Sequence, residues 1–207
     1  VEATRAAAGV APDGSGARTE RDLRSTLATL ALACGDLEEF GRQLPLLEML
    51  GADPGELLYH RVSLTLLEGQ PERAAVQLAL SEASTPRERR ARGFLAAWAA
   101  LLQGRIDRAA AQVEQLEPPI AGRDAAMAAL LRGLCAAASG DAEGARAWVA
   151  SVEPPRRAGA RAWVDAALAV GTPGFDAALA EAERVSVDDL GFRLARQGVE
   201  RARRAAR

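Results

Sequence analysis

A glycine recurs along this chain at nearly constant spacing and divides it into similar segments. It stands at Gly35, Gly69, Gly104, Gly140 and Gly171, so successive glycines are 34, 35, 36 and 31 residues apart. Glycine adopts, without steric cost, the left-handed backbone conformation that ends many helices. The residues that follow are also alike, reading GDLEEF, GQPERA, GRIDRA, GDAEGA and GTPGFDAA. A period of about 34 residues predicts five copies of a helix-turn-helix unit.

The third copy shows both predicted helices. Its first half places apolar side chains on one helical face, at Phe94, Leu95, Trp98, Leu101 and Leu102. After Gly104 a second apolar period begins at Ile106. We expect this helix to end at the proline pair 118–119, because proline cannot donate a backbone hydrogen bond. The closing segments VEQLEPP and VASVEPP start at Val113 and Val149, one period of 36 residues apart.

The composition agrees with an all-α protein. The 207 residues are 49% hydrophobic but only 4% aromatic, so alanine and leucine must form most of the core. Alanine is the strongest helix former, and its short side chain lets helices approach closely. We therefore predict an all-α fold with almost no strand.

The repeat resembles the tetratricopeptide family over roughly residues 20 to 186. The family's small residue in the first helix falls on Ala28, Val62, Ala97, Gly133 and Val164. Its small residue in the second helix falls on Phe40, Ala74, Ala109, Ala145 and Ala178. The resemblance implies a right-handed superhelix of about five helical hairpins plus a C-terminal capping helix. Two departures stand out: the family's aromatic near the start of the first helix is mostly absent, and Pro45 is expected to interrupt a second helix.

Three parts are expected along the chain. Residues 1–18 are rich in Ala, Gly and Ser and predict a flexible N-terminal arm. The repeat domain covers residues 19–186, with helix beginning between Thr19 and Asp22. Residues 187–207 predict an Arg-rich C-terminal helix that covers the apolar end of the stack. Its packing side comprises Leu190, Phe192, Leu194, Ala195 and Val199, and we interpret its arginines as a solvated surface.

In the tetratricopeptide family the first helices line a concave surface, and the resemblance implies the same here. That surface would be polar at both ends and apolar in the middle, which suits an apolar or amphipathic protein segment. The predicted partner-binding residues are Tyr59, Ser63, Phe94, Trp98, Leu101, Met127, Leu130, Leu134, Arg161 and Asp165, with Ser25, Thr29 and Glu56 on the same surface. Family members that grip a C-terminal carboxylate use Lys and Asn, and this chain contains neither.

Two alternatives to an open groove follow from the same residues. A shift of one residue in register would make Phe94 and Trp98 ordinary core. The N-terminal arm or the C-terminal helix, from this chain or a symmetry mate, could occupy the groove instead. We predict that Trp98 lines the groove and that Trp148, on a second helix, packs in the core.

The residues offer no catalytic pattern. His60 is the only histidine and has no second His or Cys at metal-ligand spacing. Cys34 and Cys135 each fall on the apolar side of an expected helix, so we predict two buried thiols in a reducing compartment. The glycines end helices, and no phosphate-binding loop or nucleophile elbow is present. We therefore expect no enzyme activity, no metal site and no cofactor.

Charge and hydropathy narrow the partner classes. The formal net charge of -2 gives no overall attraction to nucleic acid or to an anionic membrane. No apolar run approaches the roughly 20 residues that span a bilayer, and the first residues lack the apolar centre of a signal peptide. We expect a soluble, cytoplasmic protein. All 26 basic residues are arginine, which is typical of a GC-rich bacterial genome.

Two alternative functions remain open beside a protein-binding scaffold or adaptor. The chain could be the sensor or oligomerisation domain of a larger bacterial regulator, which includes the possibility of a homo-oligomer. It could also bind nucleic acid through Arg89, Arg90, Arg92 and the arginines near the C-terminus.

Overall fold

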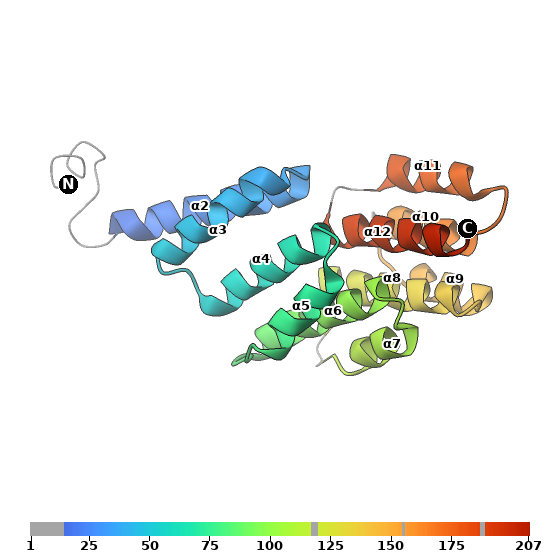
Figure 1. The fold of residues 1–207 in the computed structure, drawn as a ribbon, viewed down its shortest axis with the longest axis horizontal. Helices are drawn as coiled ribbons and strands as arrows, with labels where there is room; N and C mark the ends of the chain where they lie inside the picture. The colour runs from blue at the N-terminus through green and yellow to red at the C-terminus, as the bar shows by residue number, and fades with distance from the viewer. Residues whose placement is uncertain (1–14, 117–119, 155, 187–188) are drawn as a thin grey trace. The chain divides into compact units, whose positions relative to one another are not determined.

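The computed structural model describes residues 15–116, 120–154, 156–186 and 189–207, and within them it contains eleven α-helices and no strand (Figure 1). The all-α prediction is therefore confirmed. The helices are α2 Ser15–Cys34, α3 Leu37–Met49, α4 Pro54–Leu67, α5 Pro71–Ala79, α6 Pro86–Leu102, α7 Ile106–Glu114, α8 Gly122–Ala138, α9 Ala142–Ala150, α10 Arg156–Leu168, α11 Phe175–Val185 and α12 Leu190–Ala205. Two compact units, residues 1–64 and 65–207, divide the chain and are described separately.

The recurring glycines end helices as predicted. All five have positive φ, in chain order 76°, 76°, 73°, 82° and 80°. At Gly104, the glycine N–H donates to the carbonyl of Leu101 at 2.9 Å, and the N–H of Arg105 donates to the carbonyl of Ala100 at 2.9 Å. The second bond recurs after Gly35, Gly69 and Gly140. This is the Schellman arrangement, which satisfies the last carbonyls of a helix.

In residues 65–207 the helices pack in pairs where small residues let them meet. Helix α6 contacts α7, α8 contacts α9, and α10 contacts α11. Ala97 on α6 and Ala109 on α7 are both fully buried. In the next pair, a Cβ on Gly133 would lie 3.2 Å from the carbonyl oxygen of Ala145. The predicted crossing positions are therefore buried contacts, although Ala178 on α11 is only partly buried and Ala182, one turn later, is fully buried.

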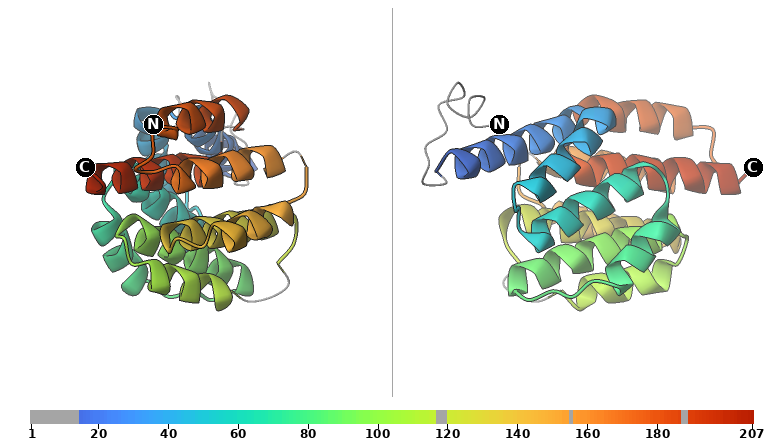
Figure 2. Two further views of the ribbon diagram at one scale, coloured as in Figure 1. Left: turned by 90° about the vertical axis from the view of Figure 1, so that its right-hand side faces the viewer. Right: turned by 60° about the vertical axis from the view of Figure 1, so that its left-hand side comes forward.

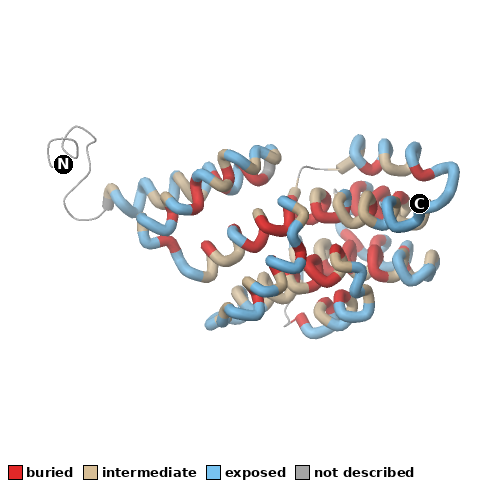
Figure 3. Tube along the Cα trace, in the orientation of Figure 1, coloured by how far each residue is buried: buried red, intermediate tan, exposed pale blue. Residues whose placement is uncertain are grey.

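The pairs of this unit stack through their first helices. Helix α8 contacts both α6 and α10, while α7 and α9 also touch the first helix of the following pair. Helix α12 contacts α10 and α6 and lies beside α10 (Figure 2). Buried positions recur along the sides of these helices that face one another (Figure 3). The core of the unit consequently lies between the first helices, their partners and α12.

In residues 1–64, α2 and α3 form one packed pair. Ala28 on α2 and Phe40 on α3 are fully buried. The expectation that Pro45 interrupts the second helix is wrong, because α3 continues through it from Leu37 to Met49. Proline removes one helical hydrogen bond, but Leu44 and Leu47 on either side of it are buried and hold the helix against its neighbours.

Two predicted boundaries also move. Helix α2 begins at Ser15, so residues 15–18 are helical and do not belong to an arm, while residues 1–14 lie outside the described residues. No proline interrupts this segment, and Arg24 pairs with Glu20 one turn away at 3.2 Å, which favours helix. Helix α7 ends at Glu114, and the proline pair expected to end it lies outside the described residues.

Candidate functional site

The structure buries most of the predicted apolar strip instead of exposing it. Trp98 is 1% exposed and Phe94 is 8% exposed, so the prediction that they line an open groove is wrong. Leu130 and Leu134 on α8 are also buried, whereas Leu101 and Met127 are partly buried. Trp98 donates its indole N–H to the sulfur of Met127 at 3.3 Å. The strip is therefore an interior contact between α6 and α8.

Helix α12 covers the face formed by the first helices α6, α8 and α10, which we call the first-helix face. A glycine lies at each of two close contacts: Gly191 of α12 faces α8, and Gly159 of α10 faces α12. A Cβ on Gly191 would lie 2.6 Å from the terminal methyl of Met127, and a Cβ on Gly159 would lie 2.9 Å from the ring of Phe192. Both separations are shorter than side chains tolerate, so an added Cβ would displace the Phe192 ring at Gly159 and the flexible end of Met127 at Gly191.

The start of α12 is held by charge. Asp189 accepts a hydrogen bond from the N–H of Gly191 at 2.7 Å and so caps the helix. The same carboxylate lies 3.4 Å from the guanidinium of Arg156 and 3.8 Å from that of Arg123. These arginines come from α10 and α8, so one acidic cap joins three helices.

The second half of α12 carries a polar clamp that the sequence interpretation missed. Arg201 donates to the carbonyl of Leu102 at 2.8 Å and to the carbonyl of Gly69 at 2.6 Å. Gln197 donates to the carbonyl of Leu67 at 2.6 Å. Leu67 and Leu102 are the last residues of α4 and α6, where helix carbonyls lack partners and the helix dipole is negative. The guanidinium therefore meets two helix ends at once.

A signal for this clamp exists in the sequence. Gln197 and Arg201 follow Leu190 and Leu194 at helical spacing, so they continue the packing stripe of α12. The interpretation of the C-terminal arginines as a solvated surface is therefore wrong for Arg201. Arg203 remains partly exposed, with its guanidinium over the ring of Phe175 at 4.7 Å and paired with the exposed Asp176 at 2.8 Å.

The polar residues predicted at the far end of the strip lie on the surface. Arg161 is exposed, and its guanidinium lies 3.6 Å from the carboxylate of Asp165 one turn later. Asp165 also accepts a hydrogen bond from Arg146 on α9 at 3.3 Å. The contact of Arg146 joins α9 to α10, whereas the pair of Arg161 and Asp165 lies within α10. Exposed ion pairs of this kind contribute little to stability.

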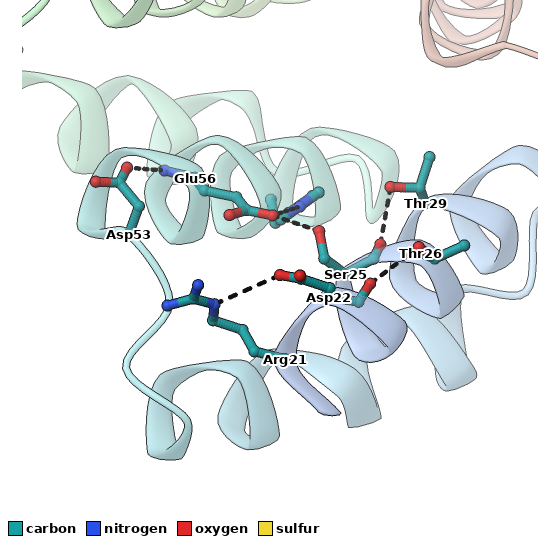
Figure 4. Close-up of polar contacts among 8 residues, drawn as sticks. Arg21, Asp22, Ser25, Thr26, Thr29, Asp53 and Glu56 are labelled. Atoms are coloured by element: carbon teal, nitrogen blue, oxygen red, sulfur yellow. Dashed lines mark hydrogen bonds and ion pairs between the residues drawn. The ribbon is translucent and has the colours of Figure 1, made fainter. Parts of the chain in front are cut away.

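In the first unit, Ser25, Thr29 and Glu56, which are predicted on the same surface, lie among the polar contacts drawn in Figure 4. The hydroxyl of Ser25 on α2 donates to the carboxylate of Glu56 on α4 at 2.5 Å. The same carboxylate oxygen lies 3.6 Å from Nε2 of His60. Ser63 is fully buried and Tyr59 is partly buried, with its ring edge-on to the ring of His60. The predicted positions on these two first helices therefore do come together.

This polar group does not form a nucleophile and base. The serine hydroxyl donates to the Glu56 carboxylate, so its hydrogen bond goes to that carboxylate and not to the imidazole of His60. Burial lowers the pKa of His60 below its usual value, although the nearby Glu56 opposes the shift. A neutral, buried imidazole between Phe40 and Tyr59 is a packing group.

The thiols differ from each other. The expectation that both cysteines are buried is wrong for Cys34, which is exposed at the end of α2. Cys135 on α8 is buried, and burial raises the pKa of its thiol to about 11. It therefore remains protonated near neutral pH. Among the described residues there is no group of three or more His, Cys, Asp or Glu side chains that could hold a metal ion.

Comparison with protein-family models, with curated proteins and with solved structures gives no match to this chain. Within the described part of the chain, no helix is both long and apolar enough to cross a membrane. The site is therefore interpreted from its own geometry.

Proposed function

We propose that this chain is a tetratricopeptide-like interaction module whose first-helix face binds an amphipathic helix of a protein partner. The proposal includes a right-handed superhelix of about five hairpins, to which the recurring glycines and the buried crossing positions lend support. One observation carries it: the face holds an amphipathic helix, α12, through an apolar stripe and a polar clamp.

The chemistry of α12 describes what such a partner must offer. Leu194 and Ala195 are fully buried, and Phe192 fits over Gly159. An acidic cap at one end pairs with arginines, and an Arg near the other end reaches helix carbonyls. A partner helix with acidic, apolar and basic groups in the same order would make the same contacts. Helix-in-groove recognition of this type depends on anchors one turn apart.

Exchange of α12 tests the proposal in the full-length chain. A specific protease site inserted after Ser186 allows α12 to be cut from the folded protein without removing it. We expect a labelled synthetic peptide of residues 187–207, in excess, to replace the cut segment, as measured by fluorescence anisotropy. The control peptides carry Arg201→Gln, which removes the clamp, or Arg207→Gln, which changes an exposed arginine.

The Arg201→Gln peptide should bind about tenfold more weakly, because a charge-assisted hydrogen bond contributes roughly 1.5 kcal/mol or more. The Arg207→Gln peptide should bind like the parent. If the cut α12 dissociates and the unaltered peptide does not bind, the first-helix face is not a helix-binding site. If the chain unfolds on cutting and the peptide fails to restore it, α12 is an inseparable part of the core.

A further inference from the structure

A basic cleft lies over α6 between α5 and α7, away from the residues that α12 contacts. It encloses about 420 Å³. Its floor is made of small residues of α6, including Gly93, Ala96 and Ala100, and α5 contributes Ala75 and Ala79 to one wall. Small side chains on the floor and on that wall leave the space open. The volume is in the range of known ligand pockets.

All the charged side chains that line this cleft are positive. Arg89, Arg92 and Arg108 line it, and no Asp or Glu is among its described lining residues. In the described part of the chain, neither Arg92, which is partly buried, nor Arg108, which is exposed, has an ion pair or a side-chain hydrogen bond. Arg90, which lies between Arg89 and Arg92 in sequence, does not line the cleft and has its guanidinium 3.8 Å from the carboxylate of Asp124 on α8. The guanidinium groups of Arg92 and Arg108 therefore stand without a counter-ion among the described residues, beside an apolar floor.

The next helix pair shows that these groups are not required by the repeat. Because Gly104 and Gly140 are 36 residues apart, each lining residue of α6 and α7 has a counterpart 36 positions later. The charged and amide residues Arg89, Arg92, Arg108 and Gln115 correspond to Ala125, Ala128, Gly144 and Ser151. Packing of the pair thus does not depend on them.

The same comparison explains why the cleft is open. Ala96 and Gln112 correspond to Arg132 and Trp148 in the next pair. There the guanidinium of Arg132 lies over the indole ring at 4.8 Å, so the two large side chains occupy the corresponding surface of α8 and α9. In the cleft, an alanine and a glutamine stand in their place.

We propose that this cleft binds an extended acidic segment of a protein partner. The lining residues run along α6 from Arg89 to its C-cap Gln103, a length of about 20 Å at 1.5 Å per residue, which matches about six residues of extended chain. Guanidinium groups bind carboxylates through paired hydrogen bonds. The amides of Gln112 and Gln115 offer donors and acceptors to a peptide backbone. This site is separate from the first-helix face and does not depend on the function proposed for it.

The test measures binding of a short dye-labelled peptide of alternating Glu and Ser to the full-length chain by fluorescence anisotropy. We expect Arg92→Gln and Arg108→Gln each to weaken binding about tenfold, as loss of a charge-assisted hydrogen bond predicts. Arg87→Gln is the matched control, because it removes the same charge from α6 outside the cleft. A peptide with Gln in place of Glu should not bind.

A second variant separates the cleft from general attraction of charge. The double substitution Ala96→Arg with Gln112→Trp introduces the side chains that the next pair carries, so the scaffold should accept it, as thermal unfolding can check. It adds a positive charge but fills the cleft, and we expect the acidic peptide to lose its binding. Equal or tighter binding by this variant would overturn the proposal, as would a loss in Arg87→Gln as large as in Arg92→Gln. Tighter binding of a single-stranded oligothymidylate that the peptide cannot displace would overturn it in favour of nucleic acid.

Discussion

Single residues in this chain take roles that depend on how deeply they are buried. Trp98 has the largest side chain among those that the structure buries completely, and its indole N–H reaches the sulfur of Met127. Trp148 is 44% exposed and lies against Arg132 on the surface. The sequence predicts that Trp98 lines a groove and that Trp148 packs in the core. The structure shows the reverse.

Replacing each tryptophan by alanine measures this difference. Trp98→Ala should lower the free energy of unfolding by about 3 to 5 kcal/mol, because it leaves a cavity in a packed interior. Trp148→Ala should cost about 1 kcal/mol or less, since it removes an exposed cation–π contact. Urea denaturation followed by circular dichroism gives both values. A Trp98→Ala protein as stable as the parent would show that this side chain is not part of the core.

His60 should make stability depend on pH. Its pKa is lowered in the folded chain by burial, so below about pH 6.5 the unfolded chain takes up a proton before the folded chain does. The stability that comes from keeping His60 neutral is fully present above that pH. It is lost as the pH falls towards the lowered pKa of His60 in the folded chain. His60→Gln should therefore lose less stability than the parent between pH 7 and the acid range. Parallel curves of unfolding free energy against pH for the two proteins would contradict this.

Glycines affect the helices of this chain in two ways: some end a helix, and others lie where α12 packs against its neighbours. Gly104 ends α6 through its own left-handed conformation, and a Cβ there would meet nothing within 4 Å. Gly159 and Gly191 lie within helices, where a Cβ would meet the Phe192 ring and the end of Met127 respectively, across the contact between α12 and its neighbours. One kind of glycine acts through local backbone geometry, and the other through packing between distant segments.

Two glycine-to-alanine substitutions separate these packing effects. Gly159→Ala should loosen α12, because the new methyl group would lie 2.9 Å from the Phe192 ring. Gly198→Ala, on α12, should be neutral or stabilising by up to about 1 kcal/mol, since its Cβ would make only an ordinary contact at 3.8 Å with Leu102 and alanine favours helix. Hydrogen exchange of the α12 amides distinguishes them, with faster exchange expected only in Gly159→Ala. Equal exchange in both would show that the ring of Phe192 moves aside without cost.

For the whole molecule, α12 closes the stack of residues 65–207 from the side of the first helices. A repeat array exposes apolar surface wherever a neighbour is missing, so its ends and open faces need covering. Helix α12 also returns to the ends of α4 and α6, so it connects the last segment of this unit with its first turn.

Removal of residues 187–207 should therefore lower the melting temperature or cause aggregation. Without α12, the apolar side chains that now cover Leu194 and Ala195 would face water. The carbonyls of Leu102 and Gly69 would also lose the hydrogen bonds that Arg201 donates. Thermal unfolding and light scattering measure both effects, and added peptide 187–207 should reverse them. A truncated chain that is monomeric and melts at the parental temperature would show that α12 covers nothing essential.

The sequence by itself determined what depends on neighbouring residues. The glycine period and the apolar spacing specify the helices and their stops, because left-handed turns and helical faces are local properties. The crossing positions come from the resemblance to the tetratricopeptide family. Which helix faces are covered depends on contacts between segments that are distant in sequence. The clamp from Gln197 to Leu67 joins residues 130 apart in sequence, and Trp98 is buried by helices whose placement no local pattern contains. The basic cleft likewise exists because α5 and α7 flank the small residues of α6, a result of packing between separate helices.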